Sequence, residues 1–469
     1  MKLLPLVSYL LIFLVFATDE IRSQSAVPTL PGFDGPLPFN LQTGYIGVGE
    51  NEEVQLFYYF VESEGNPNTD PLFLWLTGGP GCSAFSGLVY EIGPFTFDQT
   101  TFDGSLPSLI INPYSWTKVA SIIFIDSPVG TGFSYATTAQ AYASSETIAA
   151  QHNYMFLTKW LDSHPSFRKN RLYITGDSHG GKIAPMVALA IARGNEAGTM
   201  PRLLLQGYIV GNSLTDNVQD ENERIPYYHR MALISDEYFE DQLAKSSCNG
   251  RYTNPDPNNV LCLYALELVD ECVKNINTAH ILEPKCKFRS PKPDEFRLRE
   301  LLFEDDPIEL ISLSKSEVLR CRNDNYESSY AWMNNETVRE ALHIRKGTIS
   351  DWKRCNKSLS YEQDVESILE VHRLLSEKGF QALAYSGDHD GNIPYLSTLK
   401  WIRQLNLTVD SKWRPWTVDG QVAGYTEVHQ NNQAFLTFAT VKGAGHTAPE
   451  YKPKECLEMI KRWLAWYPL

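Results

Sequence analysis

The sequence predicts an α/β protein whose central sheet is mostly parallel and is covered by helices on both faces. Continuous apolar runs, which suit strands buried on both faces, alternate along the chain with patterns of helical spacing. The apolar runs lie at 72–76, 121–125, 172–175, 203–210 and 382–385. The helical patterns lie at 146–161, 182–193, 364–378 and 453–466. Alternation of strands and helices is the pattern of α/β architectures.

Two regions depart from this alternation. Residues 27–60 carry turn residues and alternating apolar positions, which is typical of antiparallel hairpins. The stretch 212–330 is rich in cysteine and has a helical pattern at 235–245, and we predict that it is an insertion that caps the site. Its charged, proline-dotted segment 289–314 predicts a mobile or proteolytically processed loop, with an ordered surface loop as the alternative. The predicted α/β core therefore consists of two parts of the chain, residues 26–211 and residues 331–469.

Composition and charge exclude several classes of function. The chain has 469 residues, of which 43% are hydrophobic and 21% charged, as expected for a folded globular protein. Its formal net charge of −15 disfavours nucleic acid and anionic membrane surfaces as partners. None of the eight cysteines forms a C-x-x-C pair, so disulfides fit better than zinc. We expect neither a metal nor a cofactor.

The N-terminus predicts a signal peptide over residues 1–25. Lys2 supplies a positive charge, and the apolar run 3–16 is shorter than the roughly 20 residues that a membrane span needs. A signal anchor is the alternative reading. The mature protein should therefore lie in a lumen and outside the membrane, where three sequons would be glycosylated, those of Asn335, Asn356 and Asn406.

The strongest chemical signal is Gly176-Asp177-Ser178-His179-Gly180, which follows the apolar run 172–175 and precedes the helical pattern at 182–193. A serine in this G-x-S-x-G pattern lies on a tight turn between a strand and a helix, with its hydroxyl exposed above the sheet. The glycines permit the turn because they carry no Cβ. The motif alone is weak evidence, and its setting between strand and helix strengthens it.

A serine nucleophile needs a base and an orienting carboxylate. Candidates follow two predicted strands near the C-terminus: Asp388 lies in Ser386-Gly387-Asp388-His389-Asp390, and His446 ends Gly443-Ala444-Gly445-His446. Both segments lie in loops just past strands, where open α/β sheets place their sites. His389 and Asp390 compete for these roles, although His389 directly adjoins Asp388, which disfavours it as the partner of that acid.

A tetrahedral oxyanion also needs two N–H donors. The glycine-rich segment 77–81 directly follows the predicted strand 72–76 and can present an unobstructed backbone N–H, that of Gly79. The backbone N–H of His179 supplies the second donor. Glycine-rich turns are common, so a purely structural role of this loop is the alternative reading.

These residues and several longer motifs together resemble the serine carboxypeptidase-like proteins, which have the α/β-hydrolase fold with a helical insertion. The resemblance covers nearly the whole mature chain. Besides the segment around Ser178 it rests on 75–83 (WLTGGPGCS), 126–135 (DSPVGTGFSY), Gly211-Asn212, 386–388 and 445–450 (GHTAPE). It implies the triad Ser178, Asp388 and His446, and an oxyanion hole formed by the N–H groups of Gly79 and His179. It also implies the disulfides Cys82–Cys355, Cys248–Cys262 and Cys286–Cys321, with Cys272 and Cys456 free.

Carboxypeptidases of this family hold the carboxylate of a peptide with a clamp of residues from which this chain departs. They usually have Asn at the position of Thr77, beside Gly78, and Glu at the position of Asp177, with a carboxylate at that of Glu91. Two close carboxyls share a proton in acid, so one can donate a hydrogen bond to the substrate. Asp177 is one methylene short for that geometry, and Thr77 offers a hydroxyl in place of an amide.

These departures are similar to the plant acyltransferase branch of the family, as is the segment 341–348. That branch takes acyl groups from 1-O-β-glucose esters and passes them through Ser178 to the hydroxyl of an acceptor. The resemblance implies a lumenal, vacuolar acyltransferase with two small-molecule substrates, and an extracellular location is the alternative. It is compatible with a monomer, a homodimer or, if 289–314 is cleaved, a heterodimer. The similarity of the segment 341–348 to this branch leads to the hypothesis that His343 or Arg345 contributes to the acceptor pocket.

Two other functions are open. The first is an acid serine carboxypeptidase or esterase, and the second is a binding protein that has kept the fold, against which the complete triad argues. His179 stands where the branch usually has Tyr. Its imidazole could line the acyl or acceptor pocket and titrate near neutrality, or it could be a substitution without function.

Overall fold

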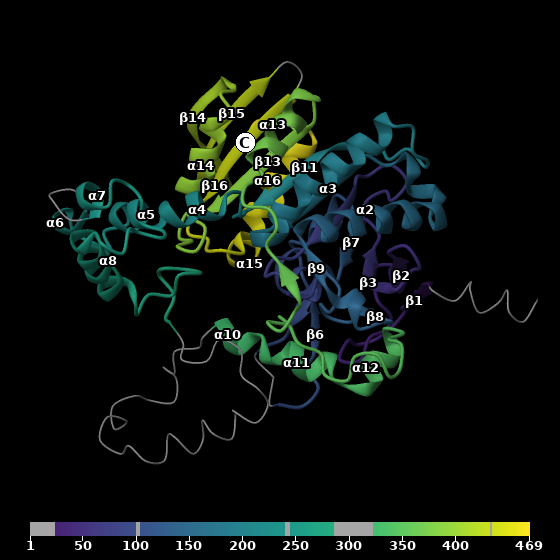
Figure 1. Cartoon of the computed structure of the whole chain (residues 1–469). Helices are drawn as coiled ribbons and strands as arrows, with labels where there is room; N and C mark the ends of the chain where they lie inside the picture. Colours follow the sequence, from purple (N-terminus) through teal and green to yellow (C-terminus); the bar gives the residue numbers. More distant parts are fainter. Residues whose placement is uncertain (1–23, 100–103, 240–243, 286–321, 432–433) are drawn as a thin grey trace, which may run out of the picture.

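A twelve-stranded sheet forms the centre of the part of the chain that the computed structural model describes, residues 24–99, 104–239, 244–285, 322–431 and 434–469 (Figure 1). Its strand order is β1-β2-β3-β7-β4-β10-β11-β13-β16-β15-β14, and β8 pairs with β3. The strands are β1 (Gln24–Ala26), β2 (Leu41–Val48), β3 (Val54–Val61), β4 (Leu72–Leu76), β7 (Ser121–Ile125), β8 (Tyr135–Ala136), β10 (Leu172–Asp177), β11 (Leu205–Gly211), β13 (Gln381–Gly387), β14 (Thr408–Val418), β15 (Gln421–Asn431) and β16 (Ala434–Val441).

The middle of this sheet is parallel, as predicted. Each neighbouring pair from β7 through β4, β10, β11 and β13 to β16 is parallel. The strands at both ends are antiparallel, and β2 and β3 form the hairpin expected within 27–60. Because parallel strands end at the same edge of a sheet, the loops after β10, β13 and β16 meet there and build the site.

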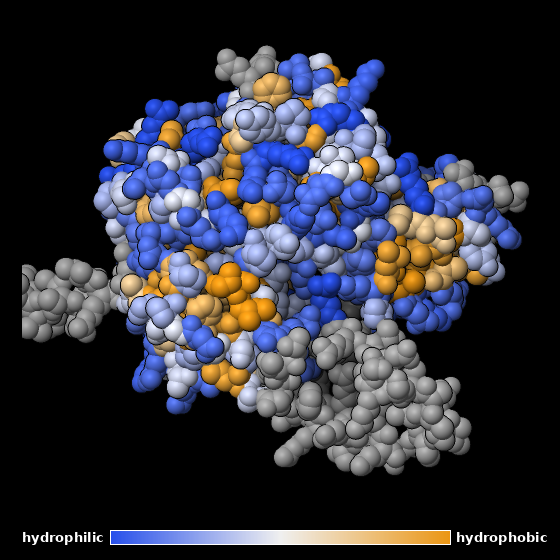
Figure 2. Space-filling model, turned by 180° about the vertical axis from the view of Figure 1, so that it is seen from behind, coloured by the Kyte–Doolittle hydropathy of each residue, from blue (hydrophilic) through white to orange (hydrophobic). Residues whose placement is uncertain are grey.

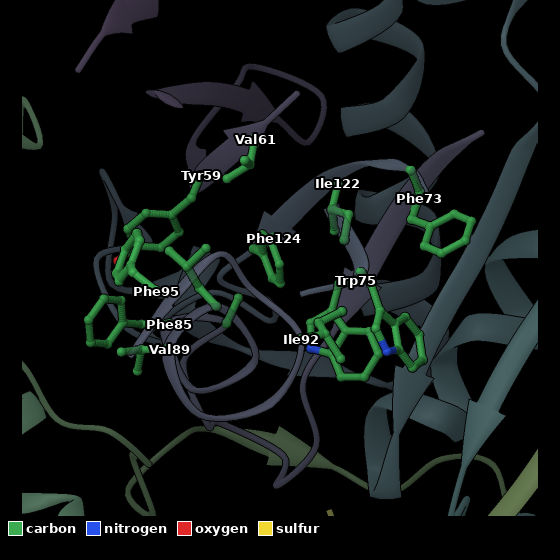
Figure 3. Close-up of a cluster of buried hydrophobic side chains, with 14 of the residues drawn as sticks. Tyr59, Val61, Phe73, Trp75, Phe85, Val89, Ile92, Phe95, Ile122 and Phe124 are labelled. Atoms are coloured by element: carbon green, nitrogen blue, oxygen red, sulfur yellow. The ribbon is translucent and has the colours of Figure 1, made fainter. Parts of the chain in front are cut away.

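The continuous apolar runs reflect two separate cores, one on each face of the sheet. Along β4, Phe73 and Trp75 belong to one core, while Leu72, Leu74 and Leu76 belong to the other. Figure 3 shows the first core, where Phe73 and Trp75 lie near residues from neighbouring strands and from the segment after β4. Because both faces of such a strand are buried, its residues are apolar at every position and do not alternate with polar residues.

Helices cover both faces. One face packs against α2 (Glu146–Ser163), α3 (Ser178–Glu196), α13 (Leu369–Glu377) and α14 (Tyr395–Gln404). The other packs against α11 (Glu327–Met333), α12 (Glu336–Ala341) and α16 (Pro453–Leu464). The α2 helix begins where expected because the Ser145 hydroxyl accepts the N–H of Ile148 at 3.3 Å. The α13 helix begins five residues later than predicted, because Ser367 still pairs with Asp216 in a β-bridge.

The described part of the insertion forms a lobe of short helices beside the sheet (Figure 1). It has a small core of its own, to which Tyr227, Phe239 and Val269 contribute. The described parts of the pattern at 235–245 are helical, and residues 240–243 lie outside the described residues. The helices of this region are α4 (Asn217–Asn222), α5 (Arg224–Arg230), α6 (Asp236–Phe239), α7 (Ala244–Ser247), α8 (Val260–Val273) and α10 (Arg322–Asn325). The predicted boundaries of the insertion at 212 and 330 remain predictions.

Short elements complete the chain. They are β5 (Phe95–Phe97), β6 (Leu109–Ile111), β9 (Ser144–Ser145), β12 (Tyr361–Glu362), α15 (Ala448–Tyr451), the single π-helical turn η2 (Gly87–Glu91), and the 3₁₀ turns η3 (Trp116–Lys118), η4 (Gln140–Tyr142) and η5 (Pro165–Lys169). The surface is mostly hydrophilic, with apolar areas of which one lies on the lobe of the insertion (Figure 2).

Two of the predicted segments lie outside the described residues. The signal peptide falls almost wholly within residues 1–23, and the segment 289–314 lies within 286–321, both outside the described residues. Among the helices that the structure describes, none is both long and apolar enough for a bilayer crossing. Glycosylation remains an expectation. Asn406 is exposed, and the Asn356 amide donates to the carbonyl of Gly130 at 2.9 Å.

Candidate active site

The sharp turn expected at Ser178 is present between β10 and α3. Ser178 has a φ of +53°, in the left-handed region that non-glycine residues rarely adopt. Neighbouring backbone leaves room only for glycine at two flanking positions, because a Cβ on Gly180 would lie 2.1 Å from the carbonyl oxygen of Leu76. One on Gly176 would lie 2.7 Å from the same oxygen. The turn thus places the hydroxyl of Ser178 above the carboxyl edge of the sheet.

His446 approaches this hydroxyl from the loop after β16. Its Nε2 lies 2.9 Å from Ser178 Oγ, and its Nδ1 lies 2.7 Å from Asp390 Oδ2. Burial alone lowers the pKa of His446, but the charge and hydrogen bond of Asp390 outweigh burial, so that its pKa is raised. The three side chains form a relay in which the carboxylate orients the imidazole toward the serine hydroxyl.

The prediction of Asp388 as the acid of this relay is wrong, and Asp390 holds that position. Asp388 Oδ1 lies 2.7 Å from His389 Nδ1 and accepts the N–H of Gly443 at 2.7 Å. Its side chain is 29% exposed, whereas that of Asp390 is fully buried. The two carboxyls belong to one turn after β13, and only the path of that turn decides which of them faces His446.

Asp390 is held in place by further hydrogen bonds. Its Oδ2 accepts the side-chain amide of Asn212 at 2.8 Å, and its Oδ1 accepts the N–H of Asn392 at 2.8 Å. The carboxylate is therefore positioned independently of the histidine. Asn212 follows β11, and the sequence pattern alone gave no reason to assign it this supporting role.

The glycine-rich loop 77–81 lies directly against the nucleophile. A Cβ on Gly78 would lie 2.6 Å from the Cβ of Ser178, so that only glycine allows the loop this close. Gly79 has a φ of +127° and lines the same cavity as His179, whose N–H belongs to the unpaired first turn of α3. Both N–H groups thus belong to residues beside the nucleophile, and their role as an oxyanion hole remains a prediction.

A cavity of about 540 Å³ opens above Ser178, a size typical of sites for small molecules. Core loops, the insertion and the segment before α13 all contribute to it. Its lining includes three groups of residues that sequence reasoning did not single out: the cations Arg224 and Arg354, the aromatic Tyr326 and Tyr451, and the polar Asn217, Gln363 and Asn392. They come from distant parts of the chain, so no local motif marks them. Within the described residues, no cluster of His, Cys, Asp or Glu could hold a metal ion.

A protein-family model described as serine carboxypeptidase matches residues 31–466. The chain belongs to the serine carboxypeptidase family. It is 47% identical over 460 residues to serine carboxypeptidase-like 7 of Arabidopsis thaliana, with 98% of each chain covered. It is 44% identical over 461 residues to serine carboxypeptidase-like 17 of the same plant, covering 98% of this chain and 97% of the relative.

Comparison with solved structures gives the same fold. The yeast prohormone-processing carboxypeptidase Kex1 from Saccharomyces cerevisiae superimposes with a TM-score of 0.74 at 20% identity, over 95% of this chain and 96% of that chain. Identity this low supports the fold alone. The prediction of an α/β-hydrolase fold with a mostly parallel sheet is confirmed.

The three residues that the resemblance places in the carboxylate clamp, Thr77, Glu91 and Asp177, lie together on the cavity wall of this member of the serine carboxypeptidase family. Asp177 and Glu91 are both buried, and both line the cavity. Burial raises the pKa of both groups, that of Glu91 well above its usual range with further contributions from Asp177 and Glu450. The pair therefore carries a proton at mildly acid pH. Asp177 Oδ1 also accepts the N–H of Gly78 at 3.1 Å.

Thr77 occupies the remaining clamp position. Its Oγ1 accepts the indole N–H of Trp75 at 3.0 Å, which uses one of its lone pairs and leaves its own proton free to donate. A serine carboxypeptidase with Asn at this position would offer two amide protons instead. The hydroxyl of Thr77 thus offers fewer protons to a substrate carboxylate than an Asn amide and reaches less far toward it.

His179 lines the cavity and is also buried against a group of charged residues. Its Nε2 lies 3.5 Å from Glu146 Oε1, and its ring meets that of Tyr361 edge-on at 5.5 Å. Lys182, one turn further along α3, lies 3.6 Å from the same carboxylate oxygen. The imidazole therefore contributes to the cavity wall and packs over an ion pair beneath it.

The hypothesis that His343 or Arg345 contributes to the acceptor pocket is wrong. Neither residue lines the cavity, and both are exposed. Arg345 donates to Gln55 Oε1 at 2.7 Å and lies over the ring of Tyr45 at 4.5 Å. The segment thus packs on the N-terminal hairpin, because the turn after α12 directs it away from the carboxyl edge of the sheet.

Two of the three implied disulfides are present. Cys82–Cys355 ties the glycine-rich loop to the segment that carries Arg354, and Cys248–Cys262 closes part of the insertion. The pair Cys286–Cys321 lies outside the described residues. The two remaining cysteines are free, as expected, with Cys272 exposed and Cys456 buried.

Proposed function

We propose that this member of the serine carboxypeptidase family is an acyltransferase, which moves an acyl group from a 1-O-β-glucose ester to the hydroxyl of an acceptor. The observation that carries the proposal is an intact relay of Ser178, His446 and Asp390 beside an altered carboxylate clamp. The relay supplies acyl-transfer chemistry. The change at Thr77 and Asp177 weakens the recognition that peptide release needs.

In the first half-reaction, His446 Nε2 takes the proton of Ser178 Oγ as this oxygen attacks the ester carbonyl. The N–H groups of Gly79 and His179 stabilise the oxyanion. When the C–O bond to glucose breaks, His446 returns the proton to the departing sugar oxygen, and the acyl group stays on Ser178. The side chain of Asp390 holds the imidazole in place and stabilises the imidazolium.

In the second half-reaction, an acceptor hydroxyl enters the place that glucose has left. His446 takes its proton, the acceptor oxygen attacks the acyl-enzyme, and the ester bond to Ser178 breaks. Water competes at this step, so the cavity must bind the acceptor and keep solvent from the ester. Insertion residues on the cavity wall, such as Arg224 and Asn217, could contact the acceptor there.

The second candidate is an acid serine carboxypeptidase. A specific observation favours it: Glu91 and Asp177 lie buried on the cavity wall, where burial raises the pKa of both, so that a protonated carboxyl can donate a hydrogen bond to a substrate carboxylate in acid. Whether the shortened Asp177 reaches that carboxylate distinguishes the two functions. A non-catalytic binding role would leave the aligned relay without a purpose.

The test is a product analysis by mass spectrometry at about pH 5 to 6, where the carboxyl pair holds its proton. The purified chain meets a pool of 1-O-acyl-glucoses, a pool of hydroxyl acceptors and a blocked dipeptide, with Ser178→Ala as the control. A new ester with an equal amount of free glucose supports the transferase. Release of the C-terminal amino acid without an ester supports the carboxypeptidase, and biological activity that survives in Ser178→Ala supports the binding role.

We also propose a lumenal location in the secretory pathway, in the vacuole rather than outside the cell. The N-terminal segment 1–25, the two disulfides and the three sequons support a secretory route. Fractionation of cells that express the tagged chain, with glycosidase treatment, tests both the location and the glycosylation.

A further inference from the structure

A segment of the insertion, residues 277–283, lies against the loops that carry both His446 and Asp390; we call it the bridging segment. On the side of the base, the N–H of His446 donates to the carbonyl of Ala279 at 2.8 Å. The approach is close, since a Cβ on Gly445 would lie 2.3 Å from that carbonyl oxygen. The backbone of the base is therefore bonded to the insertion and not to the core.

The bridging segment holds the loop of the acid on both sides of Asp390. The N–H of Gly391 donates to the carbonyl of Thr278 at 2.8 Å. The N–H of Ile281 donates to the carbonyl of His389 at 3.0 Å. One short segment thus fixes the residues that flank the acid, and the base itself, relative to each other.

His280 is the side chain of this segment that touches both loops. It is 6% exposed, its Nε2 lies 3.3 Å from the carbonyl oxygen of Gly443, and its ring stacks on that of His389 at 5.5 Å with 9° between the planes. Its Nδ1 accepts the N–H of Leu282 at 3.3 Å. Both nitrogens are therefore used by a neutral imidazole that carries its proton on Nε2.

We propose that His280 is a positioning residue, which sets the distance between His446 and Asp390 by filling the space between their loops. It lines neither the nucleophile nor the cavity, and it acts through Gly443 and His389, while its ring also packs against Tyr451 of the cavity wall at 4.7 Å. This inference rests on the proposed roles of Ser178 and His446. It is independent of whether the acyl-enzyme reacts with an alcohol or with water, because both reactions use the same relay.

The inference predicts a defect in chemistry with little change in binding. In His280→Leu the hydrogen bond to Gly443 and the ring stack on His389 are lost while the backbone bonds remain. Relay geometry within about 0.5 Å is needed for full activity, and a shift of about 1 Å can cost on the order of 100-fold in rate. In His280→Gln the amide can still donate to the Gly443 carbonyl.

The experiment measures the reaction of Ser178 with diisopropyl fluorophosphate in the full-length glycosylated chain. In this reaction Oγ forms a bond to phosphorus and fluoride leaves, and His446 accepts the proton. We expect the maximal labelling rate of His280→Leu to fall by about 10- to 100-fold, with the half-saturating reagent concentration within about twofold of the native value. His280→Gln should recover most of the rate. Leu282→Ser is the matched control, since this neighbouring side chain is 69% exposed.

Labelling of His280→Leu at the native rate would overturn the inference, as would a His280→Gln variant as slow as His280→Leu. Should His280→Leu lose its cooperative unfolding transition, His280→Phe gives the same comparison, because it keeps the ring volume and removes both nitrogens. A native chain that does not react with the reagent would overturn the proposed role of Ser178 and this inference together. Native labelling with an unaffected His280→Leu would overturn this inference alone.

Discussion

Asp388 and Asp390 lie two residues apart in one turn, yet each binds a different histidine: Asp388 lies 2.7 Å from His389, and Asp390 lies 2.7 Å from His446. Only the second histidine reaches Ser178, at 2.9 Å. The turn therefore presents two Asp–His pairs of the same length, of which one belongs to the relay and the other lies beside it.

This pairing predicts opposite outcomes for two matched substitutions. Asp390→Asn should lower kcat by on the order of 10⁴-fold, because an amide cannot hold the imidazole in the required tautomer or stabilise its charge. Asp388→Asn should change kcat by less than about tenfold, because the Asn side-chain oxygen can still accept the hydrogen bonds of Gly443 and His389. Acyl transfer or fluorophosphate labelling measures both, and a larger loss in Asp388→Asn would contradict the assignment of Asp390.

The altered clamp predicts a gain of function. Thr77→Asn combined with Asp177→Glu restores the amide and the missing methylene, so the release of a C-terminal amino acid from a blocked dipeptide should rise at least about tenfold. Ester formation should not rise with it. Each single variant serves as a control for the other. An unchanged peptidase rate in the double variant would mean that these positions do not limit peptide binding, and it would favour the carboxypeptidase reading.

Buried carboxyls contribute stability in mild acid that is lost toward neutrality, whereas buried histidines with a lowered pKa, such as His372, contribute in the opposite sense. Burial raises the pKa of Asp126 to about 6 and that of Asp220 to about 7, from the value of 3.8 for an aspartate in water. Between pH 4 and 7 these two carboxyls bind more protons in the folded state than in the unfolded state, so the stability that they contribute falls as pH rises through this range. Asp220→Asn should flatten this dependence.

Melting temperatures at pH 5.0 and 7.5 measure this effect: between these pH values the melting temperature of the native chain should fall by about 2 to 5 °C relative to that of Asp220→Asn. Asp364→Asn is the control. The pKa of Asp364 is lowered to about 2 by hydrogen bonds that outweigh its burial, so its contribution is complete above pH 4 and is lost only in stronger acid. Its replacement should shift both melting temperatures equally. Equal changes of melting temperature in the native chain and in Asp220→Asn would refute the prediction.

The Cys82–Cys355 disulfide joins residues 273 positions apart and borders the cavity. Its removal in Cys82→Ser/Cys355→Ser should lower the free energy of unfolding by about 2 to 5 kcal/mol, because the unfolded chain regains the freedom that the link removes. It should also slow labelling of Ser178, since the glycine-rich loop is then less firmly held. Urea unfolding and labelling rates check both effects. Cys272→Ser, at an exposed free cysteine, should change neither.

Much of the fold followed from the sequence because hydrophobic pattern and turn chemistry act locally. The runs 72–76 and 172–175 are apolar throughout since both faces of the sheet are covered, and the glycines around Ser178 are required by a turn that leaves no space for a Cβ. The start of α13 differs from the prediction because residues before it pair with a distant segment of the chain, as Ser367 does with Asp216.

The missed parts of the site depend on long-range geometry. No local pattern distinguishes Asp388 from Asp390, because the same turn could direct either side chain toward His446. Arg345 belongs to a segment whose sequence is similar to that of the acyltransferase branch, but its side chain packs on Tyr45 of the N-terminal hairpin. Arg354 was missed for the converse reason: it reaches the cavity through a disulfide-linked segment.

The bridging segment has a consequence for the diversification of such chains. If the lobe only covered the cavity, it could be exchanged between relatives as a module. Such an exchange would change which molecules enter the cavity and would leave the reaction at Ser178 unchanged. Here the backbone N–H of His446 and that of Gly391 both end on carbonyls of the lobe. Chimeras that graft a foreign lobe should therefore lose turnover unless residues 277–283 stay with the core, and mutations that accumulate in the lobe are constrained by the reaction as well as by the ligand.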